Sequence, residues 1–464
     1  MSKLQHDVSV RAVKAVNPVL LTLPFAAAWF AYYANRLASP FYYWGNWVVV
    51  GLFFLLYITF CRVYDGFLFS TMRISELVYS QALASLISNG ILYVVICLLS
   101  KRFANPLPLF LVVAADVVLS AAWAFCSHQW YFARFPASRS AVVYDAREGL
   151  ERLVQEYGLE KKFKIYVAMT IQQALANKED LANMETVFLS GIHSHDRNIL
   201  LKYCVEHDIT VYVIPRIGDV LMSGAHAMHL FHLPMLRVGR YRPSPIYLLL
   251  KRGFDILASG LATILLSPVF IGTAIAIKSH DHGPVFYKQK RLTKDGKVFE
   301  VLKFRSMRVD AEKDGVARLS TGDNDDRITP VGKVIRKVRI DELPQLLNIL
   351  KGDMTICGPR PERPEIAEQY EQELPEFRLR LQAKAGLTGY AQVYGKYNTT
   401  PYDKLMMDLM YIAHPSFLQD LQIMFATVKI LFMKESTEGF AQETPPQESG
   451  AAKKVDEGKM EKSA

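Results

Sequence analysis

The sequence predicts a chain in three parts. These are an α-helical four-span membrane domain (residues 1–135), a Rossmann-like α/β central domain (136–245), and a mixed α/β C-terminal domain (246–433) with a proline-broken re-entrant membrane helix (254–278). Three observations predict this fold class: four apolar runs near the N-terminus, a series of short β-rich runs after them, and a fifth apolar stretch interrupted by proline. The 464 residues are enough for two or three domains. Hydrophobic residues make up 51%, and the mean hydropathy of +0.11 is high for a soluble protein.

The four apolar runs are each close to the ~20 residues that cross a bilayer, although the second needs its flanking residues. Tyr and Trp residues stand at their ends, as is typical of membrane–water interfaces. Buried helices of a soluble protein are the alternative, which the clustering of all four runs before residue 130 disfavours. The runs cover residues 18–34, 47–61, 82–99 and 107–126.

The distribution of basic residues predicts the orientation in the membrane. If the N-terminus is cytoplasmic, seven Lys and Arg residues fall on inner segments and three on outer loops. The positive-inside rule then predicts that everything after residue 130 is cytoplasmic. No small-residue cleavage site follows the first run, which argues against a cleaved signal peptide. The inner residues are Lys3, Arg11, Lys14, Arg62, Arg73, Arg134 and Arg139, and the outer ones are Arg36, Lys101 and Arg102.

Cysteine content and net charge narrow the functional class. The five cysteines lie far apart and show no metal-binding or disulfide spacing, which suits a reducing compartment. The net charge of +9 could indicate nucleic-acid binding, but in a membrane protein attraction to anionic lipid or to a phosphorylated substrate explains it better. We therefore expect membrane lipid and no nucleic acid among the partners.

The central region alternates short β-rich runs with polar, helix-forming stretches, a pattern typical of a parallel sheet. The predicted strands cover residues 141–145, 163–169, 186–191 and 209–215. A dinucleotide-binding domain needs glycines directly after its first strand, where backbone approaches the pyrophosphate. No glycine occurs there before Gly149, so we interpret this domain as a degenerate Rossmann-like scaffold or regulatory module.

The fifth apolar stretch, residues 256–277, has Ser267-Pro268 at its midpoint. Proline removes a helical hydrogen bond and disfavours helix at the preceding residue. A straight crossing would place everything after Lys278 outside the cell, whereas a helix–break–helix hairpin would return it to the cytoplasm. Backbone exposed at such a bend needs partners, and the Ser267 hydroxyl is a candidate.

Two features near the C-terminus remain open from sequence. Residues 415–432 form an apolar helical pattern broken by Asp420, Gln422 and Lys429, which fits either a helix in the membrane interface or a core-facing helix. Residues 434–464 are polar and near-neutral, and we expect a disordered tail.

Two adjacent carboxylates, Asp341 and Glu342, precede Leu343-Pro344 and an apolar helical pattern. Proline is tolerated in the first turn of a helix, so the pair is predicted at or near a helix N-terminus, where negative charge is favoured. Nearby arginines should keep both groups ionised, which suits a nucleophile or a metal ligand better than a proton donor. A helix cap with surface salt bridges is the alternative.

Basic residues in three surrounding segments favour a nucleophile or metal ligand over a helix cap with surface salt bridges. Cations that neutralise phosphoryl oxygens, together with a carboxylate that binds Mg²⁺ or attacks phosphorus, are what transfer between phosphates requires. The candidate phosphate-binding residues are Lys303, Arg305, Arg327, Arg336 and Arg360.

These segments resemble the bacterial sugar transferase family, the polyprenyl-phosphate hexose-1-phosphate transferases that begin exopolysaccharide, O-antigen, capsule or glycoconjugate synthesis. The resemblance covers about residues 251–432, and the four spans with a central α/β domain resemble its longer, N-terminally extended members. The matching segments are "GPVFYKQKR", "KVFEVLKFRSM", "RITPVGKVIRK", "DELPQLLNILKGDM" and "GPRP".

The resemblance implies a reaction in which a UDP-sugar gives sugar-1-phosphate to undecaprenyl phosphate and UMP is released. It implies that Asp341 is the nucleophile that forms a covalent intermediate, that Glu342 is associated with Mg²⁺, and that Arg336 binds the lipid phosphate. It also implies a membrane hairpin broken at Ser267 and Pro268, a bacterial inner-membrane location with the catalytic domain on the cytoplasmic face, and a homodimer.

One departure from the family pattern is Ala385, in "KAGLTGYAQ", where the family usually has proline. We expect a less rigid turn there. Two rival functions remain: a glycosyltransferase that releases UDP, and a non-catalytic membrane module for assembly or regulation.

Overall fold

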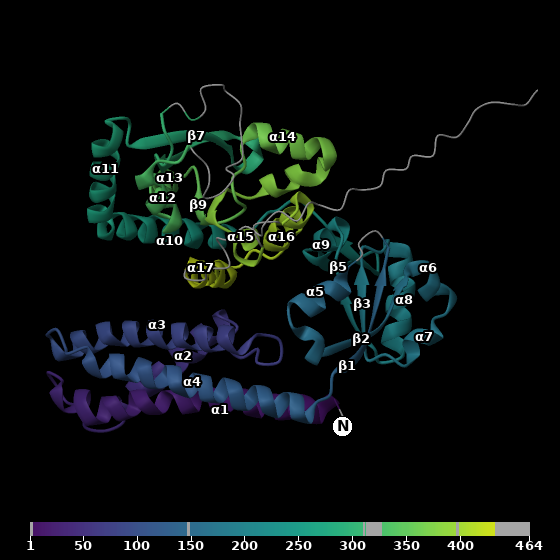
Figure 1. Cartoon of the computed structure of the whole chain (residues 1–464), viewed down its shortest axis with the longest axis horizontal. Helices are drawn as coiled ribbons and strands as arrows, with labels where there is room; N and C mark the ends of the chain where they lie inside the picture. The colour runs from purple at the N-terminus through teal and green to yellow at the C-terminus, as the bar shows by residue number, and fades with distance from the viewer. Residues whose placement is uncertain (1–2, 146–148, 310, 312–326, 396–398, 432–464) are drawn as a thin grey trace, which may run out of the picture.

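The protein is described by a computed structural model that covers residues 3–145, 149–309, 311, 327–395 and 399–431. The predicted disordered tail, residues 434–464, lies outside this coverage. Figure 1 shows a layer of long helices, a small α/β body near one end of that layer, and a larger mixed body alongside it.

Four long helices form the N-terminal layer, and each is long and apolar enough to cross a membrane, as expected for the four predicted spans. The first continues beyond its α-helical part through a π-helical turn, η1 (Trp29–Tyr33), and a 3₁₀ turn, η2 (Ala34–Arg36). The helices are α1 (Lys3–Ala28), α2 (Gly45–Val63), α3 (Ile74–Ser100) and α4 (Leu107–Arg134).

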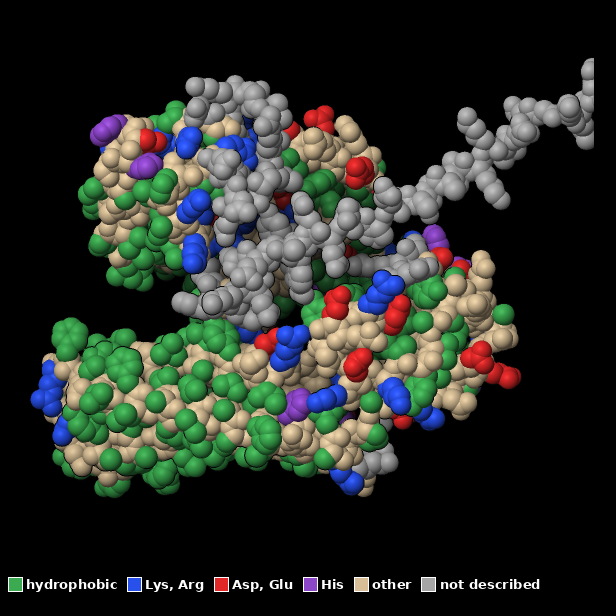
Figure 2. Space-filling view, in the orientation of Figure 1, with side chains coloured by type: hydrophobic (Ala, Val, Ile, Leu, Met, Phe, Trp, Pro, Cys, Tyr) green, Lys and Arg blue, Asp and Glu red, His purple; other side chains and the backbone are tan. Residues whose placement is uncertain are grey.

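The helix layer is apolar outside and partly polar inside. Hydrophobic side chains cover most of its visible face, with charged side chains gathered near its ends (Figure 2). Inside, Asn17 donates to Gln81 Oε1 at 3.2 Å and Tyr57 donates to Asn17 Oδ1 at 2.9 Å. Because lipid tails are as apolar as the helix surfaces, such internal hydrogen bonds help to hold membrane helices together.

The α/β body contains a four-stranded parallel sheet in the order β2-β1-β3-β4. Its strands are β1 (Ser138–Tyr144), β2 (Phe163–Thr170), β3 (Thr186–Ser190) and β4 (Thr210–Val213), which confirms the four predicted strands. Ala141, Val142 and Val143 of β1 are fully buried, as expected for a central parallel strand. An antiparallel hairpin of β5 (His226–Leu230) and β6 (Leu233–Arg237) follows and was not predicted. The helical elements are α5 (Leu150–Glu156), η3 (Leu159–Lys161), α6 (Ile171–Ala176), α7 (Glu179–Ala182), α8 (Ser194–Glu206) and α9 (Ile217–Ser223).

The fifth apolar stretch forms two helices, α10 (Pro245–Leu265) and α11 (Ser267–Asp281), which meet at a bend of 60°. The break falls at Leu266, directly before Ser267-Pro268, where the sequence predicted it. The Ser267 hydroxyl donates to the carbonyl of Ile264 at 2.7 Å, so it gives a backbone group at the bend a partner.

The larger body contains an antiparallel hairpin, β7 (Phe286–Leu292) and β8 (Val298–Phe304), and a short parallel pair, β9 (Thr355–Cys357) and β10 (Gly386–Thr388). Helices and 3₁₀ turns surround these strands. They are η4 (Lys294–Gly296), α12 (Pro330–Lys337), η5 (Ile340–Glu342), α13 (Gln345–Lys351), α14 (Pro364–Glu373), η6 (Pro375–Gln382), α15 (Tyr390–Tyr394), α16 (Pro401–Ala413) and α17 (Phe417–Leu431).

Two charged residues attach α10 to the larger body. The buried carboxylate of Asp255 accepts from Thr355 Oγ1 at 2.7 Å and from the Ile356 amide at 3.0 Å. The Arg252 guanidinium donates to the carbonyls of Ile349 and Leu350, near the C-terminal end of α13, where positive charge is favoured. The broken helix is therefore held at its base by β9 and α13.

Helix α17 packs against two parts of the molecule. On the core side, buried Asp420 accepts from Lys251 and Tyr411, each at 2.7 Å. This face of α17 therefore matches the core-facing helix, one of the two possibilities that the sequence left open. On the other side, the ring of Phe425 lies 4.9 Å from that of Phe60 in α2. Lys429 Nζ also donates to the carbonyl of Tyr64, at 3.3 Å.

The connection between α2 and α3 also contacts the α/β body. Arg73 donates to the carbonyl of Glu156 at 3.2 Å, and Lys162 donates to Ser70 Oγ at 3.4 Å. The end of the helix layer that carries this connection therefore contacts both later parts of the chain.

Substitution Asp255→Ala should destabilise the larger body by about 2 kcal/mol, because it leaves the buried Thr355 hydroxyl and Ile356 amide without their acceptor. Thermal unfolding of purified protein in detergent, followed by intrinsic fluorescence, would measure the change. Glu300→Ala is the matched control, since Glu300 pairs with Lys288 on the surface, and exposed pairs contribute little. Equal effects of the two substitutions would contradict the anchoring role of Asp255.

Candidate active site

The acidic pair lies in the 3₁₀ turn η5, between α12 and α13. Pro344 directly precedes α13, so the pair stands one turn ahead of that helix, as predicted. Arg339, just before η5, adopts a left-handed backbone conformation (φ 58°), which is uncommon outside glycine and turns the chain sharply between the two helices. Gly352 ends α13 with a φ of 98°, a conformation that glycine adopts without a steric penalty.

Asp341 is the more buried carboxylate, with 9% of its surface exposed. Its burial and the neighbouring charge of Glu342 raise its pKa above the usual value, against the opposing influence of Lys303, Arg336 and Arg339. For Asp341, withdrawal from water outweighs the cations, so its pKa shifts upward although basic residues surround it.

The pKa of Glu342 is shifted in the opposite direction to that of Asp341. Burial acts to raise its pKa, but Lys303, Arg360 and Arg339 outweigh burial and hold the pKa well below its usual range. Glu342 Oε1 accepts from Lys303 Nζ at 3.2 Å and from Arg360 Nη2 at 3.1 Å. Arg339 Nη1 lies 3.9 Å from Oε2. Glu342 is therefore a carboxylate that stays ionised inside a ring of cations.

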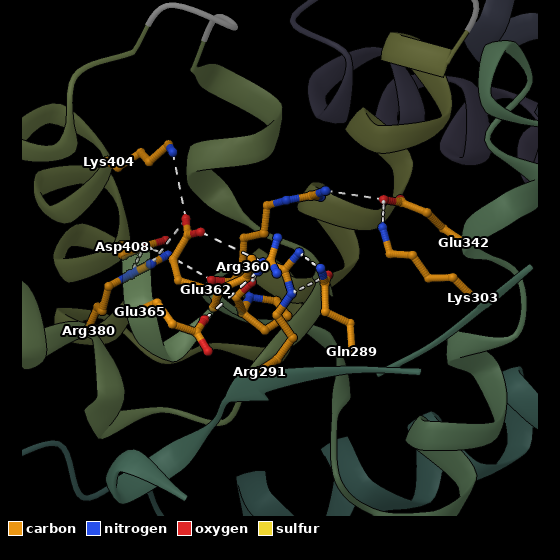
Figure 3. Close-up of polar contacts among 12 residues, drawn as sticks. Gln289, Arg291, Lys303, Glu342, Arg360, Glu362, Glu365, Arg380, Lys404 and Asp408 are labelled. Atoms are coloured by element: carbon orange, nitrogen blue, oxygen red, sulfur yellow. Dashed lines mark hydrogen bonds and ion pairs between the residues drawn. The ribbon is translucent and has the colours of Figure 1, made fainter. Parts of the chain in front are cut away.

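The ring is assembled from segments that are distant in sequence. Lys303 comes from β8 and Arg360 from the loop after β9 (Figure 3). Asn348 of α13 fixes β8 next to the acidic turn, because its side chain accepts from the Leu302 amide at 2.9 Å and donates to the carbonyl of Glu300 at 2.8 Å. The buried side-chain amide of Asn348 thus fixes the position of the strand from which the Lys303 side chain extends.

The other predicted phosphate-binding residues are placed differently. Arg336 lies on α12, near enough to lower the pKa of Asp341. Arg305 is buried and forms an ion pair with Asp281 at the end of α11, and among the described residues it makes no hydrogen bond or ion pair with the acidic pair. Arg327 is the first residue that the structure describes after residue 311. Its backbone carbonyl accepts from the Arg308 amide at 2.9 Å.

Several charged residues behind Arg360 were missed by the sequence analysis: Arg291, Glu362, Arg380, Lys404 and Asp408. Figure 3 shows Glu362, Arg380, Lys404 and Asp408 on the side of Arg360 away from Glu342, and Arg291 below Arg360 beside Gln289. Arg291 ends the "GPVFYKQKR" segment, so a signal for it existed. The polar partners of Arg380 lie 18 to 28 residues away, and no local pattern indicates them.

Ala385 compensates for the missing proline. Its backbone amide donates to Thr293 Oγ1 at 3.1 Å, a bond that proline could not make. Its carbonyl accepts from the Thr355 amide at 2.9 Å. The expected loss of rigidity is therefore opposed by hydrogen bonds on both sides of the residue.

The site offers a buried carboxylate next to an ionised one, with cations on several sides. This arrangement can hold a phosphorylated ligand while a carboxylate oxygen approaches phosphorus. In the described residues, no group of three or more His, Cys, Asp or Glu side chains could hold a metal alone. Two adjacent carboxylates nevertheless match the way Mg²⁺ binds phosphorylated ligands, through one or two carboxylates and the phosphate oxygens.

Comparison with known proteins places the site in a family. Residues 246–434 match the family described as "Bacterial sugar transferase". Over 234 residues, the chain is 40% identical to a UDP-N-acetylgalactosamine-undecaprenyl-phosphate N-acetylgalactosaminephosphotransferase of Aeromonas hydrophila, which covers 50% of this chain and 54% of that protein. The alignment thus spans about half the length of that relative.

Two further relatives are covered over more of their length. A UDP-glucose:undecaprenyl-phosphate glucose-1-phosphate transferase of Caulobacter vibrioides is 39% identical over 206 residues, which are 43% of this chain and 76% of that protein. An exopolysaccharide production protein of Rhizobium leguminosarum is 40% identical over 190 residues, which are 39% of this chain and 94% of that protein. Together with the motifs around Asp341 and Glu342, these matches show that the chain belongs to the bacterial sugar transferase family.

Proposed function

We propose that the protein is a membrane phosphoglycosyl transferase that moves sugar-1-phosphate from a UDP-sugar to undecaprenyl phosphate and releases UMP, as the first step of exopolysaccharide, O-antigen or capsule synthesis. The observation that carries the proposal is the acidic pair, with Asp341 buried and Glu342 held ionised by Lys303 and Arg360. The Aeromonas and Caulobacter relatives, which are named as transferases of sugar phosphates to undecaprenyl phosphate, support it.

In the first step, a carboxylate oxygen of Asp341 attacks the β-phosphorus of the donor. A bond forms between that oxygen and phosphorus, and the bond from the β-phosphorus to the bridging oxygen breaks, so UMP leaves. The sugar-1-phosphate is then held on Asp341 as an acyl phosphate. Lys303 and Arg360 lie where they can neutralise the diphosphate oxygens as charge moves toward UMP.

In the second step, an oxygen of the lipid phosphate attacks the same phosphorus and Asp341 leaves as a free carboxylate. The product is a sugar linked to the lipid through a diphosphate. Arg336, on α12 beside Asp341, is the proposed ligand of the lipid phosphate. Division of the transfer into two displacements requires a carboxylate that is positioned and ionised.

We further propose that Glu342, with Asp341 beside it, holds Mg²⁺ when the donor is bound. Such an ion would supply neutralisation of the diphosphate charge. The chain itself keeps Glu342 ionised, since Lys303, Arg360 and Arg339 hold its pKa below the usual range.

The membrane arrangement is part of the proposal. We infer that α10 and α11 form a re-entrant hairpin that enters and leaves the bacterial inner membrane by its cytoplasmic face. The 60° bend, the Ser267 hydrogen bond and the exposed apolar side chains support it. Those side chains include Leu257, Leu261, Ile264, Leu265, Ile271 and Ile275. The family resemblance also suggests a homodimer.

Purified protein with Mg²⁺ and undecaprenyl phosphate should release UMP from one member of a UDP-sugar panel. Asp341→Asn and Glu342→Gln should each lower the rate by at least about 10³-fold, because each removes a charge that the transfer uses. Nucleotide-specific assays for UMP and UDP would read the result. The relatives are named for different sugars, so the panel includes UDP-glucose, UDP-galactose and UDP-N-acetylhexosamines.

The same assay separates the rival functions. Release of UDP would identify a glycosyltransferase and remove the assigned role of Asp341. Near-normal turnover in either variant would contradict the role of that residue. Absence of product across the panel, in protein that is folded, would favour the non-catalytic membrane module. Lys351→Ala is a matched control, because Lys351 pairs with Asp353 at the surface and should not affect transfer.

The rate of UMP release should fall at low pH, because the nucleophile must be ionised and burial raises the pKa of Asp341. Ionised Asp341 is present above its pKa and lost as the pH drops through it. Among the cations, Lys303 acts most strongly to lower this pKa, so Lys303→Met should move the acidic limb of the pH–rate profile to higher pH. An unchanged acidic limb in the variant would contradict this electrostatic account.

A topology experiment tests the hairpin. Single cysteines at Arg242 and at Lys278, in a background without the five native cysteines, should both react with a membrane-impermeant maleimide only after the cytoplasmic face is exposed. Pro268→Leu, which restores a helical hydrogen-bond donor, should favour a continuous helix and alter the labelling at Lys278. Labelling of Lys278 from the outside in the unaltered chain would show a simple span.

A further inference from the structure

Arg360 lies in the segment of residues 359–362. All four backbone carbonyls of this segment accept hydrogen bonds from other parts of the chain. The carbonyl of Pro359 accepts from the Gly386 amide, at 2.9 Å, and that of Glu362 accepts from the Leu292 amide, at 3.0 Å. The two carbonyls between them accept from the guanidinium groups of Arg291 and Arg380. Arg291 donates to Pro361 at 3.0 Å, and Arg380 donates to Arg360 at 2.9 Å.

Two features make this segment rigid. Prolines at 359 and 361 fix the backbone on both sides of Arg360. Gly386 packs directly on the segment, since a Cβ there would lie 2.2 Å from the amide nitrogen of Gly358. The main chain on which Arg360 stands therefore has little freedom to move.

Arg380 is the most buried member of this support, with 3% of its surface exposed. Its Nε and Nη2 atoms lie 2.8 and 2.6 Å from Asp408 Oδ2, and Asp408 is itself 1% exposed. Its Nη1 lies 3.5 Å from Glu362 Oε1. A single guanidinium thus ties α16 to two residues of the Arg360 segment (Figure 3).

We propose that Arg380, held by Asp408, is a positioning residue that acts through Arg360. It sets the backbone from which the Arg360 side chain reaches Glu342 at 3.1 Å, and it touches no reacting group itself. A lysine could not replace it, because only the planar guanidinium presents donors to the carboxylate and the carbonyl together. The inference rests on the proposed function, in which Arg360 holds the donor diphosphate.

A double-mutant cycle tests the inference. Arg380→Lys should lower kcat/KM for the UDP-sugar about tenfold when Arg360 is present and change it less than about twofold in an Arg360→Ala background. The split of the loss between KM and kcat should match that of Arg360→Ala. Additive losses, or a different split, would overturn the inference.

Two further variants control for general damage to the fold. Lys404→Met removes another cation that faces Glu362, at 3.6 Å, but leaves the Arg360 carbonyl bonded, so it should keep kcat/KM within about twofold of the unaltered protein. Asp408→Asn retains the volume of the buried site and should shift KM and kcat in the same direction as Arg380→Lys, with the same dependence on Arg360. Loss of activity in Lys404→Met equal to that in Arg380→Lys would contradict a specific role for Arg380.

A readout without catalysis separates this inference from the proposed function. Phenylglyoxal modifies free guanidinium groups, and peptide mass spectrometry can follow its reaction at Arg360. Labelling of Arg360 should be faster in Arg380→Lys than in the unaltered protein or in Lys404→Met. Unchanged labelling would overturn the positioning role even if UMP release is confirmed, and faster labelling would support it even if transfer is not.

Discussion

The larger body depends on one electrostatic constraint: the carboxylate of Glu342 is largely withdrawn from water and needs positive charge from other segments. Lys303 and Arg360 supply that charge at 3.2 and 3.1 Å. Desolvated charge is costly unless it is paired and hydrogen-bonded. The hairpin that carries Lys303 and the loop that carries Arg360 must therefore both be in place before the acidic turn is stable in its observed position. Asn348, which joins α13 to β8, meets the first of these requirements by holding the hairpin next to the acidic turn.

The membrane helices, the parallel strands and the proline break were predictable because each is encoded locally. Apolar length identifies the spans, and short β-rich runs identify the strands. The β5–β6 hairpin was missed for an equally local reason. Its turn uses Phe231 and His232, both at positive φ, where Asn-Gly would be the recognisable signal. The core-facing side of α17 could not be decided from sequence, since it depends on the meeting of Asp420 with Lys251.

The site was predictable only where its residues belong to motifs. Lys303, Arg360 and the acidic pair stand in segments that resemble the family, and the structure brings them together. Arg305 stands in the same segment as Lys303 but pairs with Asp281, a partner from the end of α11 that no motif indicates. Burial also decided the direction of the Asp341 pKa shift, and the degree of burial is a tertiary property that nearby charges in the sequence do not reveal.

Helix α17 is synthesised after all the residues of the acidic site, although it supplies a partner that the site region needs. Every residue of the acidic site precedes Phe417, yet the carboxylate that pairs with Lys251 at the base of the broken helix comes from Asp420. The thiol of Cys357, at the end of β9, also donates to the Asp420 carbonyl, at 3.2 Å. While the ribosome still holds α17, the nascent chain contains all its motif residues, but the Lys251 ammonium lacks its Asp420 carboxylate partner. The base of the broken helix is therefore complete only once α17 is available, and the same helix docks on α2 through Phe425.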